Sequence, residues 1–282
     1  MRYHCSMISY KCPNCQLPLR VQERSVRCDY NHSFDIAKEG YVNLLLVQNK
    51  KSKEPGDNKA MLRSRQQFLD AGYYQNLATA ISNLALKYAP EPSKIIDIGC
   101  GEGYYCERLH GAFTKSNRTT EIIGVDIAKA GVQMACKRKI GMQASVASAF
   151  DLPFFNQTFD LALSVFSPIC AKETERVLKP QGIVIFVGPG ERHLRGLAEH
   201  IYQNPVDHTG NAHAQKELNT FELLESQTLQ NTLRVEGDDI FRLLSMTPYY
   251  WQSSEDQQKA IQSLPYIETP TEFSISVYRK PG

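Results

Sequence analysis

A glycine-rich segment at residues 97–103, DIGCGEG, restricts the fold of this 282-residue chain more than any other feature. It lies between an apolar run that is typical of a strand and a segment with helical periodicity. Gly99, Gly101 and Gly103 carry no side chains, so a ligand can approach the backbone of the turn closely. A dinucleotide fingerprint would need its last glycine one place later. The segment therefore indicates a ligand-binding turn of another kind, in which Asp97 is either a cofactor ligand or a structural carboxylate.

Strand-like and helix-like segments alternate over the rest of the chain, which predicts a doubly wound, parallel α/β sheet. Five apolar runs have strand character: residues 94–100, 121–127, 144–148, 159–166 and 182–189. Helices are expected before them, at 57–70 and 74–88, and the alternating segment at 272–279 predicts a late strand.

The composition is that of a globular protein in water. Hydrophobic residues make up 42% and charged residues 22%, which excludes disordered and collagen-like chains. No apolar run approaches the roughly 18 residues of a membrane span, and the first residues lack a signal-peptide pattern. We therefore expect a cytoplasmic protein without a membrane partner, built from one large domain and a smaller unit.

Three of the eight cysteines form a metal-ligand pattern with a histidine. The spacing C-x2-C-x12-C-x3-H comes from Cys12, Cys15, Cys28 and His32. Two close pairs of ligands, separated by a hairpin-length segment, suit tetrahedral zinc and leave no open coordination position. We expect one structural Zn²⁺ in a zinc ribbon whose core is too small to fold without metal. His4 and Cys5 lie outside the pattern.

Positive charge is concentrated near the N-terminus, although the net charge is only +2. Residues 1–65 hold twelve Lys and Arg against six Asp and Glu, a charge of +6, which leaves −4 for residues 66–282. A basic N-terminal unit suggests an anionic partner, and a solvated basic surface is the alternative. The same two interpretations apply to the run Lys50, Lys51 and Lys53.

The glycine turn resembles motif I of class I S-adenosylmethionine-dependent methyltransferases, in which a compact G-x-G-x-G follows an acidic residue. Asp126 ends the second predicted strand, where a carboxylate can accept hydrogen bonds from both ribose hydroxyls of a cofactor. The segments DLPF (151–154) and LKPQG (178–182) resemble the same class. The resemblance implies a Rossmann-like, mostly parallel seven-stranded sheet, with 272–279 as its antiparallel edge and Ser148 near the adenine.

Motifs over nearly the whole chain resemble the bacterial 23S rRNA guanine-N1 methyltransferase family, RlmA. After the zinc pattern they are FDIAKEGYVNLL (34–45), EPGD (54–57), RQQFLDAGYY (65–74), DIGCGEGYY (97–105), VLKPQG (177–182), GPGERHL (188–194) and MTPYYW (246–251). The resemblance implies methyl transfer from S-adenosylmethionine to N1 of a guanine in a 23S rRNA hairpin. It also implies a homodimer whose zinc domains border a basic cleft, with no DNA partner.

The resemblance extends to domains and site residues. It implies a zinc-ribbon RNA-recognition domain at 1–38, a linker and helix at 39–75, and a methyltransferase domain at 76–282. The same cysteines and histidine match the family's zinc ligands. Positions that match contacts to S-adenosylmethionine are Tyr74, Gly101, Glu102 and His193, with Asp126 as the ribose-binding acid; the motifs add Asp97, Gly99, Gly103 and Ser148. The sequence departs from the family at Gln181, where a second glycine is usual, and around Pro168.

Methylation at guanine N1 sets two chemical requirements. N1 carries a proton at neutral pH that must leave, and N1 lies on the Watson–Crick edge, so the base must be unpaired or flipped out. Glu102, Asp35 and Glu173 are candidates for accepting this proton, with no order of preference among them. Solvent is the alternative acceptor. Tyr30, Phe34 and Tyr41 are candidates for stacking on RNA bases, and packing in the ribbon core is the alternative for Tyr30 and Phe34.

Two other classes of function fit parts of the pattern. A methyltransferase of the same fold that acts on a small molecule or a protein would leave the basic ribbon without a role. A non-catalytic RNA-binding or ribosome-binding module would need a degenerate cofactor site, whereas the glycines and Asp126 are intact.

Overall fold

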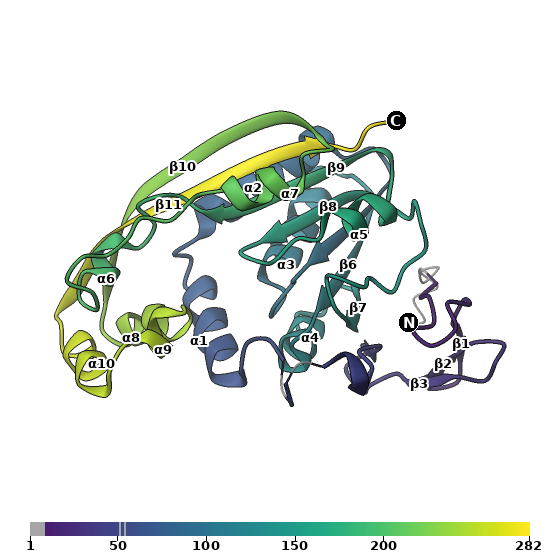
Figure 1. The fold of residues 1–282 in the computed structure, drawn as a ribbon, viewed down its shortest axis with the longest axis horizontal. Coiled ribbons are helices and arrows are strands. Elements are labelled where there is room, and N and C mark those ends of the chain that lie inside the picture. Colours follow the sequence, from purple (N-terminus) through teal and green to yellow (C-terminus); the bar gives the residue numbers. More distant parts are fainter. Residues whose placement is uncertain (1–8, 51, 54) are drawn as a thin grey trace.

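A single mixed sheet forms the centre of the molecule (Figure 1). The computed structural model describes residues 9–50, 52–53 and 55–282; His4, Cys5 and Lys51, noted above, lie outside these residues. The strand order is β10-β11-β9-β8-β5-β6-β7-β4. The strands are β4 (Val42–Asn43), β5 (Ser93–Ile98), β6 (Thr120–Asp126), β7 (Gln143–Val146), β8 (Phe159–Val165), β9 (Leu178–Pro189), β10 (Glu222–Glu236) and β11 (Tyr266–Arg279).

The central strands are buried on both faces, as expected for a parallel sheet covered by helices. Along β9, Ile183, Ile185 and Val187 join one core cluster, while Val184 and Phe186 join the cluster on the opposite face. This alternation follows from the two-residue repeat of a strand. Strands β4 to β9 run parallel, and β11 pairs antiparallel with both β9 and β10.

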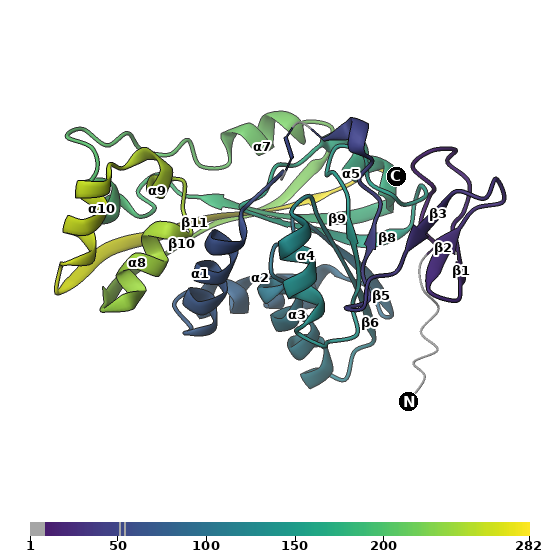
Figure 2. The same ribbon diagram turned by 90° about the horizontal axis from the view of Figure 1, so that it is seen from below.

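Helices form a layer on each face of the sheet (Figure 2). On one side lie α1 (Lys59–Asp70), α2 (Gln75–Tyr88), α3 (Tyr104–Lys115) and α4 (Lys129–Cys136), and on the other lie α5 (Ala171–Val177) and α7 (Ala212–Glu217). Leu77, Ile81, Leu84 and Ala85 recur at helical spacing in α2 and are buried, so this face of the helix packs into the core. Within the described residues, no helix combines the length and the apolar character that crossing a bilayer requires.

The two ends of the molecule are built differently (Figures 1 and 2). At one end, the long hairpin of β10 and β11 carries α8 (Asp238–Ser245), α9 (Tyr249–Gln252) and α10 (Glu255–Gln262), with α6 (Arg195–Ala198) beside them. At the other end lies the ribbon, a three-stranded antiparallel sheet of β1 (Arg20–Gln22), β2 (Ser25–Arg27) and β3 (Ser33–Asp35). The turn η1 (Val47–Asn49) precedes α1 in the chain.

The ribbon is docked onto the large domain through its first residues. Tyr10 is buried, pairs with Phe154 in an isolated bridge, and donates its hydroxyl hydrogen to the carbonyl of Ala144 at 3.0 Å. The amide of Lys11 donates to the carbonyl of Pro153 at 2.9 Å. The ribbon therefore rests on the DLPF segment at 151–154, which the sequence had singled out for the cofactor domain.

The structure corrects three details of the predicted fold. The predicted helix 57–70 begins at Lys59, because the side chain of Asn58 accepts hydrogen bonds from the Ala60 and Met61 amides and caps it. The strand at 272–279 is part of β11, which lies inside the sheet, and β10 forms the edge. Over the residues that the structure describes, the sheet has eight strands instead of seven, because β4 from the linker pairs with β7.

Candidate functional site

A cavity of about 780 Å³ opens at the carboxyl ends of β5, β6, β8 and β9. In α/β sheets this edge, where helices cross to opposite faces, is the usual place for a ligand. Of the predicted cofactor residues, those that line the cavity are Tyr74, Gly99, Gly101, Glu102, Asp126, Ser148 and His193. Asp97 and Gly103 are not among the lining residues.

The glycine turn forms the floor of the cavity in a conformation that side chains resist. Gly99 has φ +84° and Gly101 has φ +52°, both in the left-handed region. A Cβ atom on Gly99 would overlap the side chain of Ser167, whereas a Cβ on Gly101 would meet nothing within 4 Å. Gly103, at φ +85°, begins α3 and packs against Ala135. Gly99 is thus required by the protein itself, and Gly101 faces open space that a ligand can fill.

Asp126 lies at the end of β6 beside this turn. Its Oδ2 accepts the amide hydrogen of Gly101 at 2.8 Å, and its Oδ1 accepts that of Ala128 at 2.7 Å. Burial raises the pKa of the Asp126 carboxyl, and these two backbone hydrogen bonds oppose the rise. The carboxylate is therefore fixed toward the cavity with lone pairs left for a diol, as the predicted ribose contact requires.

Asp97 lies beneath the turn. It is 2% exposed, and one of its oxygens accepts the thiol hydrogen of Cys106 at 3.1 Å. Burial raises the pKa of Asp97 to about 7, and the Cys106 hydrogen bond lowers it only in part. This placement favours the structural alternative for Asp97 over direct contact with a cofactor.

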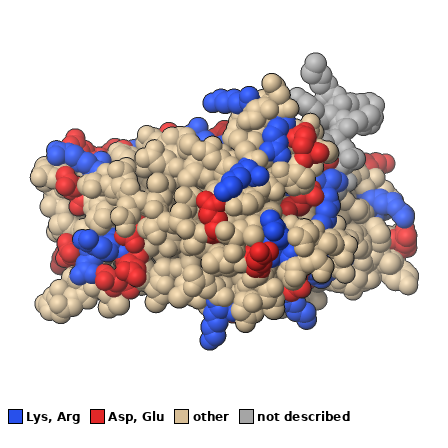
Figure 3. Space-filling view, turned by 90° about the horizontal axis from the view of Figure 1, so that it is seen from above, with Lys and Arg blue, Asp and Glu red and all other residues tan. Residues whose placement is uncertain are grey.

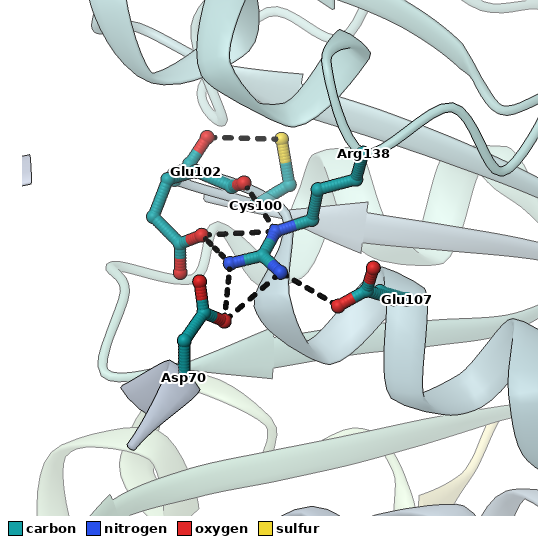
Figure 4. Close-up of polar contacts among 6 residues, drawn as sticks. Asp70, Cys100, Glu102, Glu107 and Arg138 are labelled. Carbon is teal, nitrogen blue, oxygen red and sulfur yellow. Dashed lines mark hydrogen bonds and ion pairs between the residues drawn. The ribbon is translucent and has the colours of Figure 1, made fainter. Parts of the chain in front are cut away.

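Glu102 is held by an arginine that the sequence motifs did not indicate (Figure 4). Arg138 Nε donates to the carbonyl oxygen of Glu102 at 2.9 Å and to its carboxylate at 3.0 Å. The same guanidinium contacts Glu107 at 2.6 Å and Asp70 at 3.1 Å, which ties α1 and α3 to the turn. Burial raises the pKa of Glu102, and the Arg138 charge opposes the rise. Glu102 is therefore a positioned wall of the cavity.

Tyr74 and His193 form a buried pair across the cavity. His193 Nδ1 accepts the amide hydrogen of Glu272 at 3.2 Å, so Nε2 carries the ring proton and faces the Tyr74 hydroxyl oxygen at 3.4 Å. Burial, helped by the neighbouring His208, lowers the pKa of His193 to about 3, so the ring is neutral. With its oxygen occupied by this donor, the Tyr74 hydroxyl can give its own hydrogen to a ligand.

Ser148 lies at the end of the cavity nearest the ribbon. Its hydroxyl oxygen accepts the amide hydrogen of Phe150 at 3.1 Å, and Phe150 itself lines the cavity with 63% of its surface exposed. An exposed aromatic ring at the predicted adenine end can stack on a planar base. Sequence reasoning missed Phe150, although its place two residues after Ser148 was a usable signal.

The opposite end of the cavity contains further residues that sequence reasoning missed. Phe166 follows β8 and is 43% exposed, with φ +51°, which is unusual for an aromatic residue. His208 and Tyr249 also line this end, and His208 Nε2 lies 3.3 Å from the Tyr249 hydroxyl oxygen. They come from segments far apart in the chain, and His208 belongs to no motif. The MTPYYW match, which includes Tyr249, was the available signal.

Two of the predicted proton acceptors lie outside the cavity. Asp35 is an exposed residue of ribbon strand β3. Glu173 is paired with Arg176 at 2.8 Å and accepts the amide hydrogen of Leu152 at 2.7 Å. The third candidate, Glu102, is in the cavity but is bound to Arg138.

The three predicted stacking residues have different environments. Tyr30 is 71% exposed and stays a candidate for contact with RNA bases. Phe34 is half-buried and packs on the ribbon core, as its alternative stated. Tyr41 is buried against Val132 and Ala144, so its prediction as a stacking residue is wrong: its ring fills space between the linker and the sheet.

The four predicted metal ligands come together at one end of the ribbon. Cys12, Cys15, Cys28 and His32 offer ligand atoms that all lie within 4.8 Å of one another. Cys15 Sγ is 3.5 Å from Cys28 Sγ, and His32 Nδ1 is 3.6 Å from Cys12 Sγ. A tetrahedral zinc with bonds of about 2.3 Å to sulfur would separate two sulfurs by about 3.8 Å. The cluster therefore fits zinc, with Nδ1 as the histidine ligand.

Comparisons with known proteins agree with this geometry. The zinc-ribbon family described as "RlmA, N-terminal" matches residues 10–53, and a methyltransferase-domain family matches residues 91–259. The chain is 32% identical to the 23S rRNA (guanine(748)-N(1))-methyltransferase of Streptomyces fradiae, over 93% of this chain and 92% of that protein. It is 28% identical to the putative 23S rRNA (guanine-N(1)-)-methyltransferase YxjB of Bacillus subtilis, over 96% and 97%.

A solved structure carries the same fold. The YcgJ protein from Bacillus subtilis superposes with a TM-score of 0.52 and 18% identity, covering 74% of this chain and 99% of that one. Fold, glycine turn and Cys/His cluster together define a class I, S-adenosylmethionine-binding methyltransferase with an N-terminal zinc ribbon. Within that class, the chain belongs to the RlmA family of 23S rRNA guanine-N1 methyltransferases.

Proposed function

We propose that the chain transfers a methyl group from S-adenosylmethionine to N1 of a guanine in a hairpin of 23S rRNA. The observation that best supports this function is one cavity with two different ends. The glycine turn and Asp126 line one end, and aromatic and histidine side chains suited to a flipped base line the other. The names of the relatives from Streptomyces fradiae and Bacillus subtilis support the same reaction.

We propose the following cofactor contacts. Asp126 binds the ribose hydroxyls, Ser148 and Phe150 flank the adenine, and the backbone of Gly99 and Gly101 lies against the cofactor. Glu102, Tyr74 and His193 border the methionine end, where an acid suits an ammonium group and the Tyr74 hydroxyl suits a carboxylate. S-adenosylmethionine supplies the electrophilic methyl group, and these residues fix its direction relative to the acceptor.

The acceptor has to enter the cavity as a single base. N1 is on the pairing edge, so the guanine must leave its stack, which costs least in a hairpin loop. Loss of the N1 proton leaves an electron pair for in-line attack on the methyl carbon. The residues of this chain would thus orient the base, exclude water and remove one proton.

The proposed reaction can be tested by mapping modified nucleosides. Digested 23S rRNA from a strain lacking the protein, analysed by mass spectrometry, is expected to lack one N1-methylguanosine. The purified protein with S-adenosylmethionine should restore it in rRNA from that strain. Methylation at another atom, or only of a small molecule or a protein, would contradict the proposal and favour the alternative methyltransferase.

We also propose that the ribbon provides the RNA contact. Arg24 and Arg27 lie in the ribbon, and Lys50 and Lys53 lie in the linker after η1. Within the described residues none of these four side chains has a carboxylate partner within 4.0 Å. Arg20 and Lys38, by contrast, pair with Asp29 and Glu39. Figure 3 shows cationic side chains interspersed with anionic ones on the face it presents, without a uniformly basic patch. The cations that lack a carboxylate partner would therefore attract the phosphates of the RNA.

Charge reversal in the ribbon is expected to weaken RNA binding and its salt dependence. The double variant Arg24→Glu/Arg27→Glu should lower the slope of log Kd against log salt by about 2 if both side chains contact phosphates. The matched control, Lys115→Glu/Lys259→Glu, changes the same charge at exposed positions on α3 and α10 and should leave the slope unaltered. Fluorescence anisotropy with a labelled hairpin measures the salt dependence of Kd for both double variants. If Arg24→Glu/Arg27→Glu has the same slope as the wild type, these two arginines do not contact the RNA.

Three further proposals rest on the family relationship. We propose a ribbon domain through residue 38, a linker and helix at 39–75, and a methyltransferase domain from 76. We also propose that two chains form a homodimer whose ribbons border one RNA cleft. The protein would act in the cytoplasm, where 23S rRNA is made and folded.

A further inference from the structure

Three histidines line the cavity: His193, where the proposed methionine end meets the acceptor end, and His208 and His213. Resting on the proposed function, we propose that His208 is the catalytic base that removes the N1 proton of the target guanine. Histidine is suited to this step because its unperturbed charge change falls between pH 5 and 8. Two features of the cavity single out His208: the ring nitrogens that are already engaged, and the place where the base can lie.

His208 is anchored but keeps one nitrogen available. It is half-buried in the connecting segment 199–211, and its amide donates to the carbonyl of Glu191 at 2.9 Å. Its Nε2 lies 3.3 Å from the Tyr249 hydroxyl oxygen. Among the described residues, Nδ1 of His208 has no hydrogen-bond partner. When Nε2 carries the ring proton and donates to Tyr249, Nδ1 is free to accept a proton from a ligand.

The other two histidines are less suited to the role. His193 is occupied at both ring nitrogens, by the Glu272 amide and by Tyr74, and burial lowers its pKa to about 3. His213 is exposed on the short helix α7, and within the described part of the chain no hydrogen bond, ion pair or ring contact orients its ring. His208 combines access to the cavity with a fixed orientation.

The acidic residues that line the cavity are engaged elsewhere. Asp57 is paired with Arg65, Glu102 with Arg138, and Asp126 with two backbone amides. Glu102 and Asp126 belong to the proposed cofactor end. Among the described residues, a proton acceptor near the acceptor base therefore has to come from the histidines, with solvent as the other source.

Phe166 indicates where the guanine would lie. Its ring centroid is 5.6 Å from that of His193, and the His193 centroid is 6.3 Å from that of His208, so the three rings share one end of the cavity. Phe166 is exposed there, and its amide is fixed to the carbonyl of Val187 at 2.9 Å despite the positive φ. A planar base stacked on this ring would present its edge to the neighbouring histidine.

The proposed step balances in protons and electrons. The N1–H bond breaks and its proton moves to Nδ1 of His208, which becomes an imidazolium; the electron pair stays on N1. N1 forms a bond to the methyl carbon as the bond from that carbon to sulfur breaks, with its electrons going to sulfur. The imidazolium then releases the proton to solvent. Tyr249 contributes by accepting the Nε2 hydrogen bond, which strengthens when the ring is charged.

The test compares single-turnover methylation of a 23S rRNA hairpin by wild type, His208→Ala and His208→Asn. We expect both variants to react roughly 100- to 10,000-fold more slowly, the usual contribution of a general base. Calorimetric Kd values for the hairpin and for S-adenosylmethionine should stay within about twofold, and imidazole in the buffer should partly rescue His208→Ala. Tyr249→Phe should show a smaller loss, roughly 2- to 10-fold.

The pH profile separates a base from a structural residue. The wild-type rate should rise with pH and then level off, whereas the His208→Ala rate should keep rising because hydroxide replaces the imidazole. The groups around His208 are His193, His213 and Tyr249, together with Asp207 on its own segment, which is paired with Arg195 of α6. None of these is altered in the variant. His200→Ala, an exposed histidine on the same segment, is the matched control.

Two results would overturn the inference. One is a His208→Ala rate above a third of wild type; the other is a slower rate with an unchanged pH profile. If the wild-type protein itself forms no N1-methylguanosine, the proposed function fails. If the wild type and His208→Ala are both active, only the role of His208 fails.

Discussion

Gly99→Ala is expected to lower the affinity for S-adenosylmethionine by roughly 100-fold or more while the protein stays folded. Gly99 has φ +84°, where an alanine costs about 1–2 kcal/mol, and its new Cβ would overlap the Ser167 side chain. Overpacking adds roughly 1–3 kcal/mol. The turn can relieve this strain only by moving away from the bound geometry, and about 3 kcal/mol of lost binding energy corresponds to roughly 100-fold in Kd.

The measurement is a calorimetric titration with S-adenosylmethionine, with circular dichroism as a check on folding. Gly111→Ala is the matched control, because Gly111 lies within α3 and a Cβ there meets nothing within 4 Å. It should stabilise the protein by about 0.5–1 kcal/mol and leave Kd unchanged. Adding Ser167→Gly to Gly99→Ala removes the overlap but not the backbone cost, so it should restore part of the affinity. Binding by Gly99→Ala within threefold of wild type would refute this account.

The sequence predicted those parts of the site that are encoded within one short segment. The turn at 97–103 and the acid at the end of β6 were found because strand, glycine spacing and carboxylate are adjacent in the chain. The ribbon ligands were found for the same reason. The choice between the two roles of Asp97 could be made only from the structure. It favours a structural carboxylate, because the burial of Asp97 under the turn depends on Cys106 and the surrounding sheet.

Other features depend on segments that only the tertiary fold brings together. Arg138 follows α4 but binds Glu102 and Asp70 from distant segments, and His208 meets Tyr249 from 41 residues away. No local pattern marks either contact. In the fold, β10 was missed because its sequence is largely polar and exposed, and β4 because it has only two residues. Their pairing with β11 and β7 is decided by the partner strand.

Removal of zinc is expected to unfold the ribbon and abolish RNA methylation. Its strands have three residues each, and its buried core includes two of the ligands, Cys12 and Cys28, beside Leu19 and Val26. So small a core cannot offset the entropy of ordering the segment. Structural zinc supplies an apparent binding free energy of about 10–16 kcal/mol in comparable small domains. Cys28→Ser, or chelation of the wild type, should therefore release the metal and the fold together.

The effect should extend to the cofactor cavity, but more weakly than that of Gly99→Ala. The ribbon holds the segment 151–154 through Tyr10 and Lys11, and that segment follows Ser148 and Phe150 at the proposed adenine end. Releasing it should loosen this end and leave the glycine turn and Asp126 in place. We therefore expect a several-fold rise in Kd for S-adenosylmethionine, well below the roughly 100-fold rise for Gly99→Ala.

Hydrogen exchange together with a colorimetric zinc assay distinguishes these effects. In Cys28→Ser, amides of β1 to β3 should exchange fast, those at 151–154 should lose part of their protection, and those of β5 and β6 should be unchanged. Cys170→Ser, a cysteine outside the cluster, is the control and should keep one zinc per chain. Protected ribbon amides without metal would refute the structural role of zinc. If the ribbon unfolds and the amide protection at 151–154 is unchanged, only the coupling between ribbon and cavity is refuted. The docking contacts of Tyr10 and Lys11 would then not stabilise the cavity.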